Sequence, residues 1–269
     1  MARHNVIVVT ASTEKQARAV ESELAARMRA GAYGADTTLF AVPDPQNARV
    51  GSGGATLHAL LVVADLMAGG PHRLADCRIF MIHSGGDSQR LPAQSVCGKA
   101  WSALPSVDAE SGELQAPIDL LVKTMLDLFA SVDAGLVVAS SDVLLLVPPG
   151  FVTHWPQRGV TGLAIPADKS LGPHHGCYQA SAQRAAAGPD AANCYRVSRF
   201  WQKASVPELT AGGAVRPADG TVLIDSGVVY FSPAATQELL GLCEASPLDC
   251  CTYRGLDMGR APLRIELYR

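Results

Sequence analysis

The feature that most constrains the fold is an alternation of short apolar runs with segments of helical periodicity. The run Asn5–Thr10 is rich in β-branched residues, and Ala17, Val20, Leu24 and Met28 follow it at helical spacing. A second run, Thr38–Val42, precedes a glycine-rich loop and the helix-like stretch Thr56–Met67. Strands that alternate with helices of this length are typical of βαβ units, whose parallel strands are buried on both faces.

The same alternation continues through the rest of the chain. We expect further strands at Arg78–His83, Leu136–Ala139, Val160–Ile165, Val222–Phe231 and Leu263–Leu267, further helices at Ile118–Ala130 and Ala234–Leu242, and surface loops at Ala185–Ala192 and Ala211–Gly220. No internal repeat, heptad or low-complexity linker divides the sequence. The pattern therefore predicts one α/β domain over residues 1–269, Rossmann-like, with a mainly parallel central sheet and helices on both faces.

Composition argues against several classes of protein. The net charge is −3 and like charges do not cluster, so the chain lacks the basic stripe that nucleic-acid binding requires. The N-terminal apolar run is too short for a signal peptide, and polar residues at 140–142 interrupt the longest apolar stretch, so we expect no membrane span. The seven cysteines lack zinc-site spacing, and we interpret them as reduced thiols, mostly in the core of a cytoplasmic protein.

The most informative segment is Ile82–Trp101, which reads IHSGGDSQRLPAQSVCGKAW. A glycine turn after a buried strand lets backbone N–H groups approach phosphate oxygens, so Gly85, Gly86 and the nearby Ser88 are candidate nucleotide-binding residues. Arg90 and Lys99 are candidate catalytic residues: the planar Arg90 side chain would hold a leaving pyrophosphate, and Lys99 would place a charge near the reacting phosphates. The alternative is a structural turn with a surface arginine and lysine.

This segment resembles the signature of sugar-nucleotide pyrophosphorylases, which is G-G-x-G-T-R-L followed by P-K. The chain departs from the signature at three positions. Ser88 replaces the third glycine, Gln89 replaces the threonine, and Gly98 precedes Lys99 in place of proline. The resemblance implies nucleotidyl transfer, and the departures raise the alternative of a catalytically silent relative.

A second glycine-rich segment, VGSGGATLHAL, starts at Val50. Gly51, Gly53, Gly54 and Thr56 precede a helix, whose N-terminus can receive an anion, so these four are further candidate nucleotide-binding residues. The segment lacks the G-K-[ST] sequence of a Walker loop. A tight loop that turns the chain into the helix is the alternative.

Two carboxylates are candidate ligands of Mg²⁺. Asp142 follows the apolar strand Leu136–Ala139, where open α/β sheets bind ligands, and Asp225 lies in the comparable setting VLIDSGVVYF. Magnesium is usually held by one or two carboxylates together with phosphate oxygens. For Asp142 the alternative is a helix cap or a turn, and for Asp225 a structural role is equally compatible with the sequence.

A polar loop over Ile165–Tyr178 is the candidate site for a sugar phosphate. Its candidate substrate-binding residues are Lys169, His175 and Gly176, because such a loop can hydrogen-bond a sugar and its phosphate. His174 and His175 are adjacent and cannot face one partner as helical i, i+4 ligands do. We therefore expect at least one of the two histidines to lie in a solvated turn.

With these residues in view, the chain is similar to L-fucokinases and fucose-1-phosphate guanylyltransferases. The segments that carry the resemblance are VIVVTAS, DPQNARVGSGGATLHALL, IHSGGDSQRLP with GKAW, SSDVLL, HHGCY, DSGVVYF and PLDCCTYRGLDMG, which spans Pro247–Gly259. The resemblance implies a GT-A-like nucleotidyltransferase core that converts GTP and L-fucose 1-phosphate, with Mg²⁺, to GDP-L-fucose and pyrophosphate.

Longer members of this family add a β-helix and a GHMP-type kinase domain, whose P-x-x-x-G-x-G-S-S-like loop has no counterpart here. We therefore expect no kinase activity from this chain alone, although it could associate with a kinase domain. Two further hypotheses remain open. One is a silent module that binds nucleotide or supports a kinase domain, and the other is an enzyme of similar fold for another nucleotide and sugar phosphate.

Overall fold

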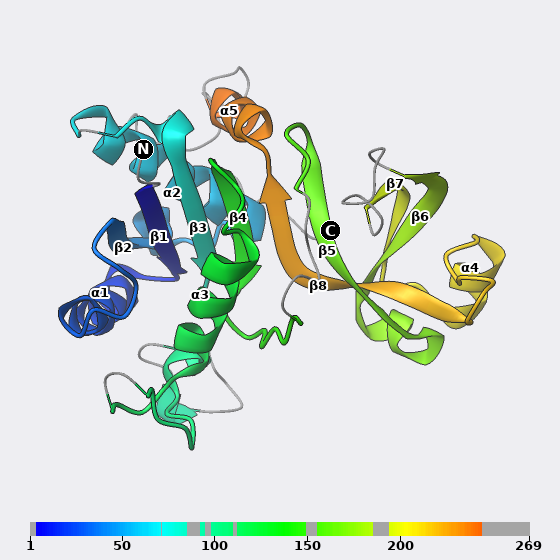
Figure 1. Ribbon diagram of the computed structural model, residues 1–269, viewed down its shortest axis with the longest axis horizontal. Coiled ribbons are helices and arrows are strands. Elements are labelled where there is room, and N and C mark those ends of the chain that lie inside the picture. Colours follow the sequence, from blue (N-terminus) through cyan, green and yellow to red (C-terminus); the bar gives the residue numbers. More distant parts are fainter. Residues whose placement is uncertain are drawn as a thin grey trace.

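A computed structural model describes residues 4–70, 72–84, 92–94, 98–109, 112–148, 155–184 and 194–243 of the chain (Figure 1). The strands are β1 (His4–Ala11), β2 (Thr37–Pro43), β3 (Cys77–His83), β4 (Gly135–Ser140), β5 (Val160–Asp168), β6 (Gly176–Arg184), β7 (Tyr195–Gln202) and β8 (Thr221–Phe231). The α-helices are α1 (Glu14–Arg29), α2 (Gly51–Ala68), α3 (Pro117–Leu128), α4 (Val206–Ala211) and α5 (Pro233–Leu242). Short 3₁₀ turns are η1 (Pro45–Asn47), η2 (Leu74–Asp76), η3 (Pro92–Gln94), η4 (Lys99–Trp101) and η5 (Lys169–His174).

The eight strands form one mixed sheet in the order β2-β1-β3-β4-β8-β6-β7, with β5 paired to β8. The strands β2, β1, β3 and β4 are parallel, and we call them with α1, α2, α3 and α5 the parallel half. The strands β5, β6 and β7 pair in antiparallel fashion and form with α4 the antiparallel half. β8 is antiparallel to β4 and belongs to both halves, as Figure 1 shows.

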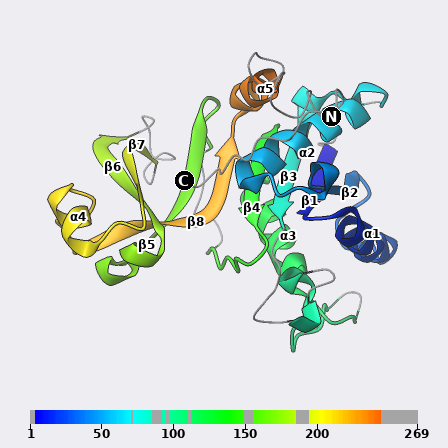
Figure 2. The same ribbon diagram turned by 180° about the vertical axis from the view of Figure 1, so that it is seen from behind.

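Alternating side chains of the parallel strands divide the core into two layers. In β1, Ile7 and Val9 pack on the side of α1 and α3, whereas Val6 and Val8 pack on the side of α2 and α5. Figure 1 shows α3 in front of the sheet, and Figure 2, from behind, shows α2 on the opposite face. The α/β class and the helices on both faces are therefore confirmed. The sheet is only partly parallel, because β4 is followed in the strand order by an antiparallel partner.

Local sequence features account for the ends of α1, and the described cysteines agree with the prediction of reduced thiols that lie mostly in the core. The side chain of Thr13 caps α1 by accepting a hydrogen bond from the N–H of Gln16. Glu14 in the first turn and Arg27 and Arg29 in the last turn complement the helix dipole. Of the described cysteines, Cys77, Cys177, Cys194 and Cys243 are free thiols, and all but Cys194 are buried.

Other local predictions were wrong or lie outside the described residues. The glycine-rich segment at 51–54 is the first turn of α2 and not a loop. α2 also has the length and apolar composition of a membrane span, which the sequence analysis did not anticipate, but its buried face packs in the core against the sheet. Strands β6 and β7 and helix α4 were not predicted. The expected strand Leu263–Leu267 and loop Ala185–Ala192 lie outside the described residues.

Candidate functional site

The carboxyl end of β3 is the point at which the candidate segments meet. The N–H of Ser84, just after β3, donates to the carbonyl of Thr10 in β1 (3.3 Å), and the N–H of Ser141, after β4, donates to the carbonyl of His83 (2.9 Å). These contacts extend the parallel ladder beyond the strands, so the segments that follow β1, β3 and β4 lie side by side. Ligands of open α/β sheets bind at this edge.

His83 joins β1, β3 and α2 through its two ring nitrogens. Nδ1 lies 3.0 Å from the Thr10 hydroxyl, and Nε2 lies 3.0 Å from the hydroxyl of Thr56 in α2. The Thr56 hydroxyl donates its proton to the carbonyl of Ser52 (2.8 Å), so it must accept from Nε2–H. Nδ1 is then the unprotonated nitrogen and accepts from Thr10. Burial lowers the pKa of His83 to about 4, which keeps this ring neutral.

This arrangement gives the predicted nucleotide-binding residue Thr56 a structural contact. Its hydroxyl bonds to Ser52 and His83, and the residue is only 1% exposed. Gly51, Gly53 and Gly54 form the first turn of α2, which has no side-chain cap and starts with Gly51 at a positive φ of 76°. The predicted contacts of these four residues with a nucleotide stay predictions.

Asp44 lies close to the start of α2 and was missed by the sequence analysis. It follows β2 and accepts a hydrogen bond from the backbone of Val50, the residue before the helix. Burial raises the pKa of Asp44 to about 6, and Arg49 and the Val50 hydrogen bond oppose this shift. A carboxylate therefore already lies beside the helix N-terminus at which a phosphate was predicted.

Two serines near the end of β3 and β1 present buried hydroxyls. The Oγ atoms of Ser84 and Ser12 are buried and have no hydrogen-bond partner among the described residues. Buried hydroxyls usually have a partner, and an unpaired one costs about 1–3 kcal/mol. The side-chain carbonyl of Gln16 accepts from the N–H of Ser12 (2.8 Å) and helps to hold this serine in place. The two hydroxyls are thus candidate donors to a ligand at the carboxyl edge.

Lys99 reaches this edge from η4. Gly98 precedes it with a φ of 93°, and a Cβ on Gly98 would lie 3.1 Å from the Oγ of Ser84. Gly98 and Ala100 are buried whereas Lys99 is exposed, so the turn directs the lysine toward solvent next to the end of β3. Proline requires a φ near −65°, so the glycine that replaces the proline of the pyrophosphorylase signature has a backbone conformation that proline cannot adopt.

Asp142 and Asp225 lie on neighbouring segments at the same edge. Asp142 is exposed in the turn after β4, and its Oδ1 accepts from the Ser140 hydroxyl (2.5 Å). Asp225 lies in β8, two residues before Gly227, and a Cβ on Gly227 would lie 3.9 Å from that of Ser140 and 3.3 Å from Val143. The two predicted magnesium ligands therefore come from adjacent chain segments.

The surroundings of Asp225 are compatible with a ligand on one side of its carboxylate. Its Oδ1 accepts from the Tyr178 hydroxyl (3.1 Å) and from the N–H of Gly227 (3.0 Å). Burial raises the pKa of Asp225, and these two hydrogen bonds and His175 oppose the shift. The described residues contain no cluster of three or more His, Cys, Asp or Glu side chains that could hold a metal ion. Two carboxylates fit Mg²⁺, which keeps water and phosphate oxygens as its other ligands.

Only the His175 end of the predicted sugar-phosphate loop lies beside Asp225, because Asp168, the residue before Lys169, is opposite Thr221 and not opposite Asp225. Lys169 and His175 are exposed, and His175 is close enough to Asp225 to affect its pKa. Gly176 starts β6, and a Cβ there would collide with the ring of Phe200. His174 ends η5 in an exposed position, as expected for a residue in a solvated turn.

The predicted site residues Gly85, Gly86, Ser88 and Arg90 lie outside the described residues, as does the segment Pro247–Gly259 that carries part of the family resemblance. Sequence reasoning missed His83, Ser84 and Gln16. The first two were in view in the run IHSGG, but the glycines alone were considered there. A histidine and a serine at the end of a buried strand were the signal that could have identified them.

Comparison with known proteins identifies relatives of this chain. The family model described as fucose pyrophosphorylase domain matches residues 71–269. A bifunctional fucokinase/GDP-fucose pyrophosphorylase of Arabidopsis thaliana is 27% identical over 91% of this chain and 25% of its own length. A fucose-1-phosphate guanylyltransferase of Mus musculus is 29% identical over 65% of this chain and 29% of its own length. The chain thus spans less than a third of these curated relatives.

A solved structure, CMP:2-keto-3-deoxy-manno-octonic acid synthetase complexed with CTP, is similar over 98% of this chain and 90% of its own, with 14% identity and a TM-score of 0.31.

Proposed function

The chain belongs to the family of fucose pyrophosphorylase domains, and from this premise we propose that it transfers a guanylyl group from GTP to L-fucose 1-phosphate, giving GDP-L-fucose and pyrophosphate. In this reaction a phosphate oxygen of the sugar phosphate attacks the α-phosphorus of GTP. The bond from that phosphorus to the bridging oxygen of the β-phosphate breaks, and pyrophosphate leaves. The attacking oxygen is already an anion, so the site needs no general base.

The work of the site is to position and neutralise phosphate groups. We assign Lys99 to the charge that develops around the α-phosphate and Arg90 to the leaving pyrophosphate. Asp142 and Asp225 would hold Mg²⁺, which supplies positive charge to the phosphate oxygens. The Oγ atoms of Ser84 and Ser12 would donate hydrogen bonds to the nucleotide, because they have no partner among the described residues. Gly51, Gly53 and Gly54 remain candidates for a further backbone contact.

The observation that carries this proposal is the meeting of four segments at His83 and Ser84. The start of α2, the turn with Lys99, the segment with Asp142 and the end of β1 all contact these two residues directly or through a neighbour. Three of these segments, the start of α2, the turn with Lys99 and the segment with Asp142, bear residues predicted from the sequence as contacts of the nucleotide, its phosphates or Mg²⁺. Their adjacency supports one site for a phosphate-rich substrate pair.

The sugar phosphate would bind on the side of the antiparallel half. His175 is exposed beside Asp225, Lys169 is exposed at the other end of the same loop, and Gly176 leaves room for the Phe200 ring at the start of β6. A lysine and a histidine are suited to a phosphate group, and the aromatic ring to the apolar side of a sugar. We further propose that the protein is cytoplasmic and can associate with a kinase domain.

Release of pyrophosphate from GTP and L-fucose 1-phosphate tests the proposal. We expect release only when Mg²⁺ and both substrates are present, and less release with UTP, ATP or CTP. Omission of the sugar phosphate is the matched control, because it separates transfer from hydrolysis of GTP. Release with another nucleotide or sugar phosphate, but not with this pair, would assign the site to a different nucleotidyl transfer.

A catalytically silent module is the second candidate, and one observation favours it. Gly98 departs from the signature, and its positive φ shows that the turn before Lys99 differs from one that starts with proline. Thermal stabilisation by GTP without any release of pyrophosphate would support the silent module, since a ligand that binds the folded state raises its melting temperature.

A further inference from the structure

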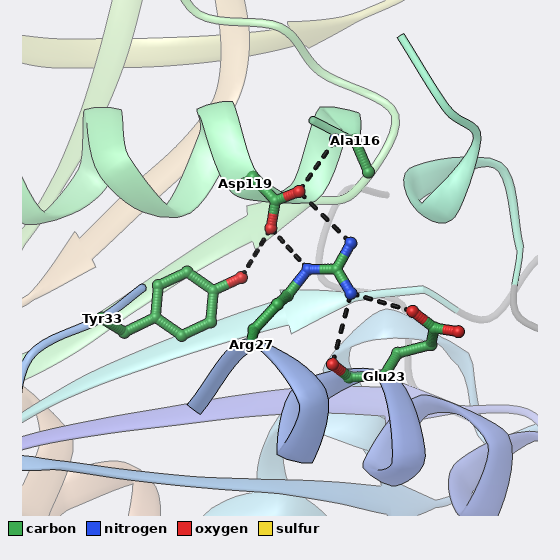
Figure 3. Close-up of polar contacts among 5 residues, drawn as sticks. All are labelled: Glu23, Arg27, Tyr33, Ala116 and Asp119. Carbon is green, nitrogen blue, oxygen red and sulfur yellow. Dashed lines mark hydrogen bonds and ion pairs between the residues drawn. The ribbon is translucent and has the colours of Figure 1, made fainter. Parts of the chain in front are cut away.

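A network of polar contacts on the far side of η4 connects α1 to α3. Arg27, in the last turn of α1, donates from Nε to Oδ1 of Asp119 (2.6 Å) and from its second terminal nitrogen to Oδ2 (3.2 Å). Its other terminal nitrogen bonds to the Glu23 carboxylate (2.9 Å) and carbonyl (3.2 Å). Figure 3 shows the guanidinium between the two carboxylates. All of its N–H-bearing groups are therefore engaged, and its plane is fixed.

Asp119 is fixed in the same way from its own side. The Tyr33 hydroxyl donates to Oδ1 (2.8 Å), and the N–H of Ala116 donates to Oδ2 (2.8 Å) at the start of α3 (Figure 3). The side chains of Arg27 and Asp119 are only 16% and 20% exposed. A bidentate pair with this little solvent is geometrically rigid. The guanidinium of Arg27 is therefore held in one position between α1 and α3.

The free face of this fixed guanidinium covers Trp101, the last residue of η4. The Cζ of Arg27 lies 4.7 Å from the centroid of the Trp101 ring, which is a cation–π contact. The indole Nε1 is buried and has no hydrogen-bond partner among the described residues. Ring stacking and packing, and not a hydrogen bond, therefore hold Trp101. Lys99 lies two residues before Trp101 in the same turn.

The turn is thus held at both ends and bears its lysine in between. Gly98 rests against Ser84 at one end, Trp101 lies under Arg27 at the other, and the backbone is closed by the bonds from Trp101 N–H to the Gly98 carbonyl (3.3 Å) and from Ser102 N–H to the Lys99 carbonyl (3.2 Å). The N–H of Gly98 also donates to the carbonyl of Gln94 (2.7 Å), which fixes the start of the turn. At the other end, the contact of Trp101 with Arg27 helps to determine where the lysine lies.

We propose that Arg27 is a positioning residue for Lys99, which it holds in place through Trp101; this inference rests on the proposed function, in which the Lys99 charge acts on the phosphates. Arg27 itself does not touch the substrates. A displacement of about 1 Å in a charged group can reduce turnover by as much as 100-fold. Loss of the contact between Arg27 and Trp101 should therefore affect turnover more strongly than it affects the stability of the protein.

The test compares Arg27→Met with Tyr33→Phe. Methionine keeps much of the aliphatic length but removes the fixed cation from the ring. Tyr33→Phe removes one hydrogen bond of Asp119 and leaves the contact of Arg27 with Trp101, so it is the matched control for loss of network stability. Hydrogen exchange of the Trp101 and Ser102 amides reports the turn without any need for activity. We expect exchange at least about tenfold faster in Arg27→Met, and unchanged exchange in Tyr33→Phe.

Turnover completes the test. We expect kcat to fall about tenfold or more in Arg27→Met, with little change in the KM for GTP. In a Lys99→Ala background the same substitution should cause no further loss, because Arg27 then has no lysine left to position. If the wild-type protein forms no product, this result contradicts the proposed function but not the effect of Arg27 on the turn. Unchanged amide exchange in Arg27→Met, or an equal loss of turnover with and without Lys99, would overturn the positioning role.

Discussion

The neutral state of His83 makes a definite prediction for stability at low pH. Burial lowers the pKa of His83 to about 4, compared with an ordinary value of 6.5. The unfolded chain therefore binds a proton below pH 6.5, whereas the folded protein resists it until about pH 4. The contribution of the neutral His83 ring to the free energy of unfolding is therefore fully present above pH 6.5, and it is lost as the pH falls toward 4.

The slope is about 1.4 kcal/mol per pH unit for a single site, so acidification from pH 7.5 to pH 5.0 should remove about 2 kcal/mol. Asp44 acts in the opposite direction. Its folded-state pKa is raised to about 6, so its protonation favours the folded protein as the pH falls. The pH dependence of the wild-type protein alone therefore combines at least two opposing effects and does not isolate His83.

A difference measurement does isolate it. His83→Gln retains a donor and an acceptor for Thr56 and Thr10 but does not titrate. Urea unfolding of wild type and variant at pH 7.5, 6.0 and 5.0 should give a difference in unfolding free energy that shrinks by about 2 kcal/mol from the highest to the lowest pH. Ile82→Val, one residue earlier, is the control, because its loss of about 1 kcal/mol should be the same at each pH. A His83→Gln difference that does not vary with pH would refute the buried neutral histidine.

Three other substitutions test the site and its supports. Lys99→Ala should lower turnover at least about tenfold with little change in melting temperature, and equal pyrophosphate release by this variant would remove Lys99 from the mechanism. Asp225→Asn should raise the melting temperature at neutral pH, because burial disfavours the charged carboxylate, yet abolish Mg²⁺-dependent turnover; a less stable but active variant would contradict both roles. Gly162→Ala should lower the unfolding free energy in urea by about 1–3 kcal/mol, because the added Cβ collides with Tyr178, and an unchanged stability would show that the ring can move.

Much of the parallel half could be predicted because its strands are buried on both faces. The strands β1, β3 and β4 read as nearly continuous apolar runs, and the core of each is buried. β7 gives no such signal, since all but one of its residues are exposed. α4 did carry a readable signal: Ser205 and Glu208 form a capping box, which the sequence analysis overlooked.

The candidate site was predictable only in part, because the contacts that hold its residues in place join segments that are far apart in the sequence. The glycines, Lys99 and the two aspartates were found from local patterns. The partners of His83 are 73 and 27 residues away in the sequence, at Thr10 and Thr56, and no local pattern relates them. Arg27 and Asp119 are 92 residues apart, so their effect on the turn of Lys99 was equally hidden. Residue types can indicate a phosphate site, but the side chains that fix its geometry come from the fold.

The antiparallel direction of β8 explains why the chain segments that bear the two aspartates are adjacent. The register of β4 with β8 ends with Ala139 opposite Val228, so the earlier residues of β8, including Asp225, extend past the carboxyl end of β4. A parallel neighbour in the same position would present its last residues at this edge and then leave it through a connection. β8 instead crosses the edge as a continuous strand, with Asp225 beside the turn that bears Asp142, and its outer part pairs with β5 and β6. The change from parallel to antiparallel pairing therefore both completes the candidate metal site and attaches the candidate sugar-phosphate loop to it.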